Sequence, residues 1–158
     1  MKFEEEINKI SKDLESINER QIAILDQDST NGESWDYYCN GQITNATVNR
    51  NRISGIVREL GDEFHIEITV SENEISSYCS CGLKEGVCKH VIALLYSWVN
   101  DREDFVNIST LIKRLQNMKK HELIDIFERI FEDNPANARF IASPDDEENG
   151  LDDEIFPD

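Results

Sequence analysis

The sequence has little of what membrane and exported proteins contain. The longest apolar stretch, Val91 to Val99, already includes Ser97, whereas a membrane-spanning helix needs roughly 18 or more apolar residues. The first ten residues, MKFEEEINKI, are acidic and lack the basic patch and apolar run of a signal peptide. We therefore expect no membrane partner and a cytoplasmic location, where cysteines stay reduced.

Positive charge is also scarce. The 158 residues hold 16 Lys and Arg against 33 Asp and Glu, which gives a net charge of -17. Both ends are acidic, since residues 1–36 carry a net charge of -6 and residues 143–158 one of -8, while the middle is almost neutral. This distribution argues against a general polyanion binder but is compatible with a local basic face.

The apolar periodicity predicts an α+β fold. A period of two over residues 42–79 predicts a small antiparallel β-meander. Residues 87–99 predict a short helix that is apolar nearly all round and must therefore be buried. Two further helical stripes follow, and the acidic end of the chain lacks periodicity, which is typical of disorder. The predicted parts are an N-terminal amphipathic helix (1–30), a domain of β-meander and helix (36–100), a helical extension (101–142) and a disordered acidic tail (143–158).

The N-terminal helix is expected over residues 2–25, followed by a turn-rich linker from Asp26 to Asp36. Two interpretations are open for its stripe: docking on its own protein, or a coiled-coil or groove contact with a second chain, which includes a homo-oligomer. Acidic residues that flank the stripe would repel one another in a parallel homodimer. The stripe consists of Phe3, Ile7, Ile10, Leu14, Ile17, Gln21 and Ile24.

The most informative segment lies between the meander and the buried helix. Cys79 and Cys81 stand two residues apart, and Cys88 and His90 repeat that spacing after a loop with two glycines. Three thiolates and one imidazole are the four donors that a tetrahedral zinc ion takes in structural sites. The sequence therefore predicts one structural Zn²⁺ at these four residues, with redox or disulfide use of the cysteines as the alternative.

Other chemistry is sparse in the chain. Cys39 lies outside the cluster and is expected to be a buried free thiol. His65 and His121 stand alone, so structural or solvent-facing roles are expected. The chain has no GxxxxGK[ST] motif and no nucleophile elbow. Because protein donors fill all four zinc positions, whereas catalytic zinc keeps one open, we expect no enzyme activity.

The spacing Cys79-x-Cys81…Cys88-x-His90, written CSCG…CKHVIALL, resembles the SWIM zinc finger. His90 followed by Ala93 is similar to the longer form found in recombination mediators of the Shu-complex type. The resemblance covers residues 37–100, where Tyr38 and Gly41 resemble the opening residues of the family, and the helices at 109–142 resemble a region that follows the finger in some prokaryotic members. It implies a structural zinc, a role in DNA binding or protein interaction, and no catalysis by the finger.

Two groups of basic residues allow a second interpretation, direct DNA binding. Phosphates could contact the hairpin, the finger and the helices that follow it. Alternatively, these are ordinary solvated charges that nearby acidic residues neutralise, and the net charge of -17 would oppose an approach to DNA. The candidate residues are Arg50, Arg52, Arg58, Lys84, Lys89, Lys113, Arg114, Lys119 and Lys120.

The acidic tail ends in DDEIFPD, which resembles the acidic-hydrophobic tips of bacterial single-stranded-DNA-binding proteins but lacks their terminal Phe. Ile155 and Phe156 could anchor such a tip in a basic-rimmed apolar pocket, whereas the simpler interpretation is a solubilising tail. Taken together, the sequence predicts a zinc-containing protein adaptor of a DNA repair or recombination complex. The expected partner is a protein such as a recombinase-like or helicase-like ATPase.

Overall fold

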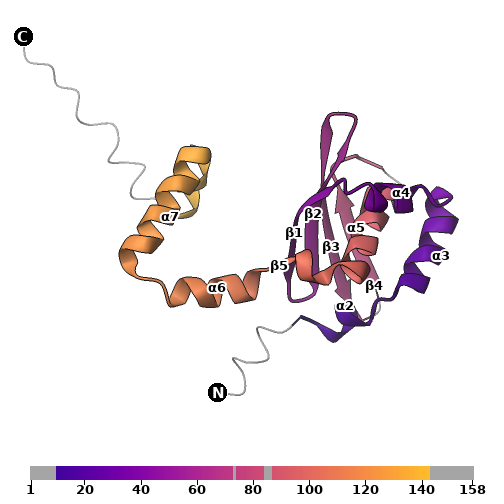
Figure 1. Cartoon of the computed structure of the whole chain (residues 1–158), viewed down its shortest axis with the longest axis horizontal. Helices are drawn as coiled ribbons and strands as arrows, with labels where there is room; N and C mark the ends of the chain where they lie inside the picture. The colour runs from indigo at the N-terminus through magenta and orange to yellow at the C-terminus, as the bar shows by residue number, and fades with distance from the viewer. Residues whose placement is uncertain (1–9, 73, 84–86, 143–158) are drawn as a thin grey trace, which may run out of the picture. The chain divides into compact units, whose positions relative to one another are not determined.

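The computed structural model describes residues 10–72, 74–83 and 87–142. Its contacts divide the chain into two units, residues 1–113 and residues 114–158, and Figure 1 shows their elements. The mixed α+β class predicted from the sequence is confirmed. Several predictions lie outside the described residues: those for Phe3, Ile7, Lys84, Ile155, Phe156 and the disorder of the tail.

A five-stranded sheet forms the centre of the first unit, with strand order β4-β3-β2-β1-β5. The first four strands form the antiparallel meander that the sequence predicts. The last strand was not predicted, because it has only two residues; it pairs parallel to β1. The strands are β1 Ile43–Asn49, β2 Arg52–Glu59, β3 Asp62–Ser71, β4 Glu74–Cys79 and β5 Val106–Asn107.

Helix α5 (Lys89–Asn100) covers one face of this sheet, as Figure 1 shows. All nine residues from His90 to Trp98 are buried, as the apolar pattern predicts. The helix lies so close to β2 that a Cβ at Gly55 would come within 2.8 Å of a methyl carbon of Leu94. Glycine at this position therefore leaves room for the Leu94 side chain against the sheet.

The single N-terminal helix predicted over residues 2–25 is wrong. Instead, α2 (Lys12–Ser16) and α3 (Glu19–Thr30) are separated by extended backbone at Ile17 and Asn18. The second helix starts there because Asn18 and Gln21 form a reciprocal capping box, in which each side chain accepts a hydrogen bond from the other's backbone N–H.

The break also changes which residues of the stripe are buried. Leu14 and Ile17 pack in the core of the first unit, in agreement with docking on the protein's own body. After the break the helical phase shifts, so that Ile22 is buried while Gln21 and Ile24 face solvent. A regular heptad pattern therefore does not describe this segment.

The linker predicted over residues 26–36 is also wrong, because α3 continues to Thr30 and α4 (Glu33–Cys39) follows after one turn. Asn31 and Gly32 make this turn, both with left-handed backbone at φ 52° and 84°. Cys39, expected to be buried, is an exposed thiol because it ends α4 at the surface.

A buried carboxylate connects these helices to the core. Asp26 accepts a hydrogen bond from the Tyr96 hydroxyl of α5 at 3.0 Å and one from the Ser34 N–H at 3.3 Å, and its side chain also bonds Thr30. Burial and the hydrogen bond to Asp26 raise the pKa of Tyr96. A buried acidic residue of α3 is therefore part of the packing, because hydrogen bonds satisfy its oxygen atoms.

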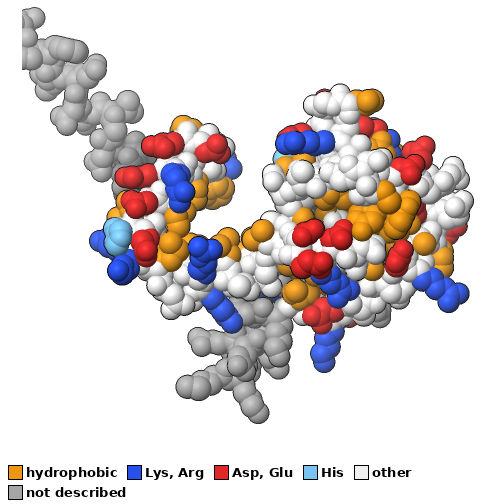
Figure 2. All heavy atoms as spheres, viewed as in Figure 1, with side chains coloured by type: hydrophobic (Ala, Val, Ile, Leu, Met, Phe, Trp, Pro, Cys, Tyr) orange, Lys and Arg blue, Asp and Glu red, His pale blue; other side chains and the backbone are white. Residues whose placement is uncertain are grey.

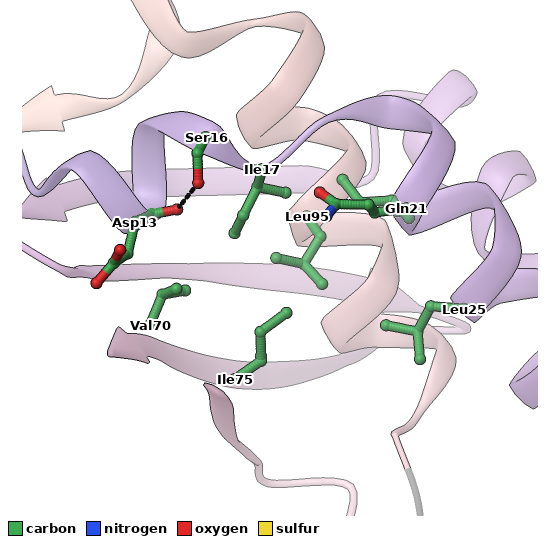
Figure 3. Close-up of a pocket in the computed structure, with 9 residues that line it drawn as sticks. Asp13, Ser16, Ile17, Gln21, Leu25, Val70, Ile75 and Leu95 are labelled. Atoms are coloured by element: carbon green, nitrogen blue, oxygen red, sulfur yellow. Dashed lines mark hydrogen bonds between the residues drawn. The ribbon is translucent and has the colours of Figure 1, made fainter. Parts of the chain in front are cut away.

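Where α2 meets α3, a cavity of about 150 Å³ opens over the sheet (Figure 3). Its walls are Ile17 and Leu25 from the N-terminal segment, Leu95 of α5, and Val70 and Ile75 of the sheet. These side chains come from four segments of the chain. The helix break thus has a packing consequence, since it leaves this corner of the core incompletely filled.

Helix α6 (Ile108–Gln116) crosses the boundary between the units, and the second unit contains α7 (Lys120–Asp133) and the 3-10 helix η2 (Pro135–Phe140). The two helices lie within the helical extension that the sequence predicts, and α7 ends before Pro135. None of the residues described between 114 and 142 is buried. Within the described ranges, every helix is too short or too polar to cross a lipid bilayer.

Candidate metal centre

The four predicted ligands come together because the sheet ends where α5 begins. Cys79 is the last residue of β4 and lies opposite the buried Ile66 of β3, so it shares the sheet face that the helix covers. Gly82, with φ 75°, turns the chain directly after Cys81. Cys88 precedes the first residue of α5, and His90 lies in its first turn.

The donor atoms form a compact set. The sulfur atoms of Cys79, Cys81 and Cys88 and a ring nitrogen of His90 all lie within 4.8 Å of one another. The Cys79 sulfur is 3.7 Å from Nδ1 of His90. Zinc–sulfur bonds of about 2.3 Å in a tetrahedron place sulfur atoms about 3.8 Å apart. The residues present therefore fit a zinc ion in composition and in spacing, and all four cysteines of the chain are free thiols.

The other nitrogen of His90 is held by a residue that the sequence did not reveal as part of the site. Nε2 lies 2.9 Å from a carboxylate oxygen of Glu59, the last residue of β2. A carboxylate in this position keeps the proton on Nε2, which leaves Nδ1 as the metal donor. No spacing rule points to Glu59, because 31 residues separate it from His90 in the chain.

Aromatic rings and a lysine complete the surroundings of the imidazole. Phe64 stacks on the His90 ring with centroids 4.4 Å apart, and Tyr37 meets it edge-on at 5.8 Å. The Tyr37 hydroxyl donates to Glu59, and the Lys89 ammonium bonds the same carboxylate at 2.8 Å. Glu59 is thus a shared acceptor for three side chains, and the orientation of His90 is fixed from several sides.

This network controls the charge of the carboxylate and of the imidazole. Hydrogen bonds from Lys89, Tyr37 and His90 lower the pKa of Glu59 to about 2. Burial of His90 favours its neutral form, but hydrogen bonds to Cys88 and Glu59 outweigh burial and raise its pKa to about 9. Glu59 is therefore an anion at neutral pH, and His90 must lose its Nδ1 proton to bind a metal ion.

The thiols differ from one another in acidity. A hydrogen bond with Cys79 and the backbone N–H of Val91 lower the pKa of Cys88 to about 4 despite its burial. The start of a helix favours a thiolate at this position. The neighbouring Cys88 and burial raise the pKa of Cys79. Zinc binding would displace the protons that remain, so the affinity for zinc should increase with pH.

The described basic residues considered for DNA binding belong to both units of the chain. Arg52 and Arg58 lie at opposite ends of β2, about 20 Å apart at the usual rise per residue. Arg58 forms an ion pair with Glu63 at 2.9 Å, and Lys89 is bonded to Glu59. Arg50 sits in the turn between β1 and β2, and Lys113 belongs to the first unit, while the second unit contains Arg114, Lys119 and Lys120.

Comparison with known proteins agrees with this geometry. Residues 60–98 match the SWIM zinc finger family, so the chain contains a SWIM zinc finger and is a zinc-binding module. The matched segment starts directly after Glu59, which leaves the carboxylate that orients His90 outside it. The chain matches no curated protein and no solved structure.

Proposed function

We propose that this chain is a structural-zinc adaptor that binds a protein partner in a DNA repair or recombination complex of the cytoplasm. The observation that carries the proposal is the closed donor set: three sulfur atoms and a ring nitrogen of His90 lie within 4.8 Å of one another, as the four donors of a tetrahedral zinc site do, and Nε2 of His90 is engaged by Glu59. Zinc bound there would join β4 to α5 and contribute to folding, with no open position for a substrate. The proposed role is therefore recognition rather than catalysis.

The open face of the sheet is the surface that supports an adaptor role. Residues of β2, β3 and β4 alternate between the face under α5 and this open face. Tyr78, 61% exposed, lies opposite Glu67, and the half-buried Ile56 lies opposite His65. Tyr78 on β4 and Ile56 on β2 flank β3 on this face, and exposed tyrosines are enriched in interface centres. A partner such as a recombinase-like or helicase-like ATPase would contact this face.

A capture experiment tests the adaptor role. The full chain, a Tyr78→Ser variant and a Leu60→Asn control are used to enrich proteins from extracts of the source organism. Leu60 is also apolar and exposed, but it lies in the turn between β2 and β3 with φ 52°, which Asn tolerates. We expect a defined partner with the wild type and the control, and its loss with Tyr78→Ser. Equal recovery with all three proteins would contradict a role for this face.

Direct DNA binding is a second candidate function, and one observation favours it. Arg114, Lys119 and Lys120 form a basic group around the end of α6 and the start of α7. Arg52 adds a basic side chain on the open face of the sheet. Against it, two further candidates, Arg58 of the sheet and Lys89 of the finger, are paired with carboxylates.

Titration with single-stranded and double-stranded DNA separates the two functions. A binder that neutralises several phosphates must lose affinity steeply between about 50 and 200 mM salt. Replacing Arg52 by Gln should then reduce the salt slope by about one, while Arg20→Gln, at an exposed position of α3, should not. Absence of a salt-dependent affinity would remove this candidate and leave the adaptor role.

A further inference from the structure

The second unit presents an apolar helix face that its own described residues do not cover. Ile124, Phe127 and Ile130 of α7 are 46%, 42% and 38% exposed. Phe131 stacks beside Phe127, with ring centroids 6.0 Å apart. Steps of three residues join Ile124, Phe127 and Ile130, and Phe131 follows Phe127 by four, so the four side chains share one side of the helix. Figure 2 shows hydrophobic side chains at the surface of this unit among acidic and basic ones.

Within the second unit, α7 packs against the short helix η2. This contact does not bury the stripe, because no residue described between 114 and 142 is buried. Phe140 and Ile141, at the end of η2, are exposed as well. A helix with such an apolar side gains most of its stability from a partner that covers it.

The charges of this unit indicate what the partner is. Residues 114–142 hold five basic and five acidic residues, so they are neutral, whereas residues 1–113 carry -9 and residues 143–158 carry -8. Residues 114–142 are therefore the part of the chain at which two copies do not repel one another through net charge. The acidic tail has the same sign as the C-terminal half of α7, with Glu128, Glu132 and Asp133, and is the poorer occupant.

We propose that α7 pairs antiparallel with α7 of a second copy of the chain. Lys120 precedes the apolar stripe and Asp133 follows it, about 20 Å apart along the helix, which is too far for a contact within one copy. An antiparallel pair with its two-fold axis near Phe127 places Lys120 of each copy beside Asp133 of the other. The two helix dipoles then point in opposite directions, which is favourable. In a parallel pair, Lys120 would lie beside Lys120 and Asp133 beside Asp133.

The size of the face sets the strength of this contact. Helix α7 has 14 residues and is about 21 Å long. A standard interface buries about 800 Å² on each partner, which one helix of this length does not reach by itself. We therefore expect a dimer that forms with a Kd on the order of 10–100 µM, as in small transient interfaces.

Sedimentation of the full, zinc-loaded chain between about 1 and 300 µM tests the proposal, because this range spans the expected Kd. The variant Ile124→Glu should remain monomeric throughout. Its matched control is Ile24→Glu on α3, since Ile24 is also an exposed helical isoleucine, 55% accessible. This control should dimerise like the wild type. Loss of the dimer in Ile24→Glu alone would assign self-association to the N-terminal segment and overturn the proposal.

A charge exchange tests the antiparallel arrangement. Lys120→Glu should weaken the dimer about three- to tenfold, since two symmetric exposed pairs are lost. Adding Asp133→Lys should restore the affinity, and far-ultraviolet circular dichroism of each variant confirms that α7 is retained. A chain that stays monomeric at every concentration overturns the proposal. If the chain stays monomeric and Ile124→Glu also lowers the midpoint temperature of thermal unfolding, the apolar face of α7 is covered by the chain itself.

Discussion

Helices α5 and α7 both carry strong apolar patterns, yet they end in opposite environments. Every residue of α5 from His90 to Trp98 is buried, whereas no residue of α7 is. The sheet covers α5, and its first turn contributes His90 to the metal cluster. Among the described residues of its own unit, helix α7 packs against the short helix η2. An apolar stripe thus predicts that a helix needs a partner, but the identity of the partner depends on the rest of the fold.

Removal of zinc is expected to have the largest effect of all the changes considered. It should unfold the first unit, which contains α5. Chelation or Cys81→Ser should unfold the finger, because structural zinc in finger peptides contributes about 10–16 kcal/mol, which is comparable to the total stability of a domain. Both tryptophans, Trp35 and Trp98, lie in the first unit, so their fluorescence reports its unfolding alone.

Elemental analysis of the wild type should find one zinc ion per chain, since the four donors fill one tetrahedral site. A wild type that contains no zinc when purified without added metal or chelator, together with a Cys81→Ser variant that folds as the wild type does, would contradict the structural role.

Truncation of one large apolar side chain in each helix compares the two units directly. Leu94→Ala should lower the free energy of unfolding by about 2–5 kcal/mol, because Leu94 is fully buried against the sheet. Phe127→Ala, measured near 1 µM where the chain is monomeric, should change it by less than about 1 kcal/mol. Urea unfolding followed by tryptophan fluorescence for the first unit and by circular dichroism for α7 measures both. Equal losses would show that α7 is covered.

Glu59→Gln should weaken zinc binding without unfolding the chain. Loss of the carboxylate that orients a histidine ligand commonly reduces metal affinity by about 10- to 100-fold. Glu63→Gln is the matched control, because Glu63 lies near the same end of the β2–β3 hairpin and pairs with the exposed Arg58 instead. Competition with a chelating indicator measures the affinities. Equal affinities in the two variants would mean that Phe64 and Tyr37 position His90 without the carboxylate.

The smallest effect is expected for the hydrogen bond between α5 and α3. Tyr96→Phe removes one donor to Asp26, which keeps its bonds to Thr30 and Ser34, so the loss should be about 1 kcal/mol. Tyr78→Phe, at an exposed tyrosine of β4, should leave the free energy of unfolding unchanged. Equal stabilities of the two variants would show that the buried hydroxyl contributes nothing.

Some features were predictable because they depend on neighbours in the sequence. The paired spacing of Cys79, Cys81, Cys88 and His90 indicated the metal cluster, and alternation of apolar residues indicated the meander. The prediction for the N-terminal segment was wrong because the spacing of the apolar stripe continues past Asn18, whereas the Asn18 side chain caps a new helix. Asn18 with Gln21 three residues later was a visible capping signal, but the apolar spacing outweighed it.

The sequence by itself determined the donor set, the four meander strands and the buried helix α5 that follows them, because each follows from local spacing and periodicity. Only the tertiary structure decided which carboxylate reaches His90, why Asp26 is buried, and which stripe stays uncovered. Glu59 and His90 are 31 residues apart, and Asp26 and Tyr96 are 70 apart. Such pairs meet only when the sheet and α5 have formed, since contact between distant segments depends on packing rather than on local propensity.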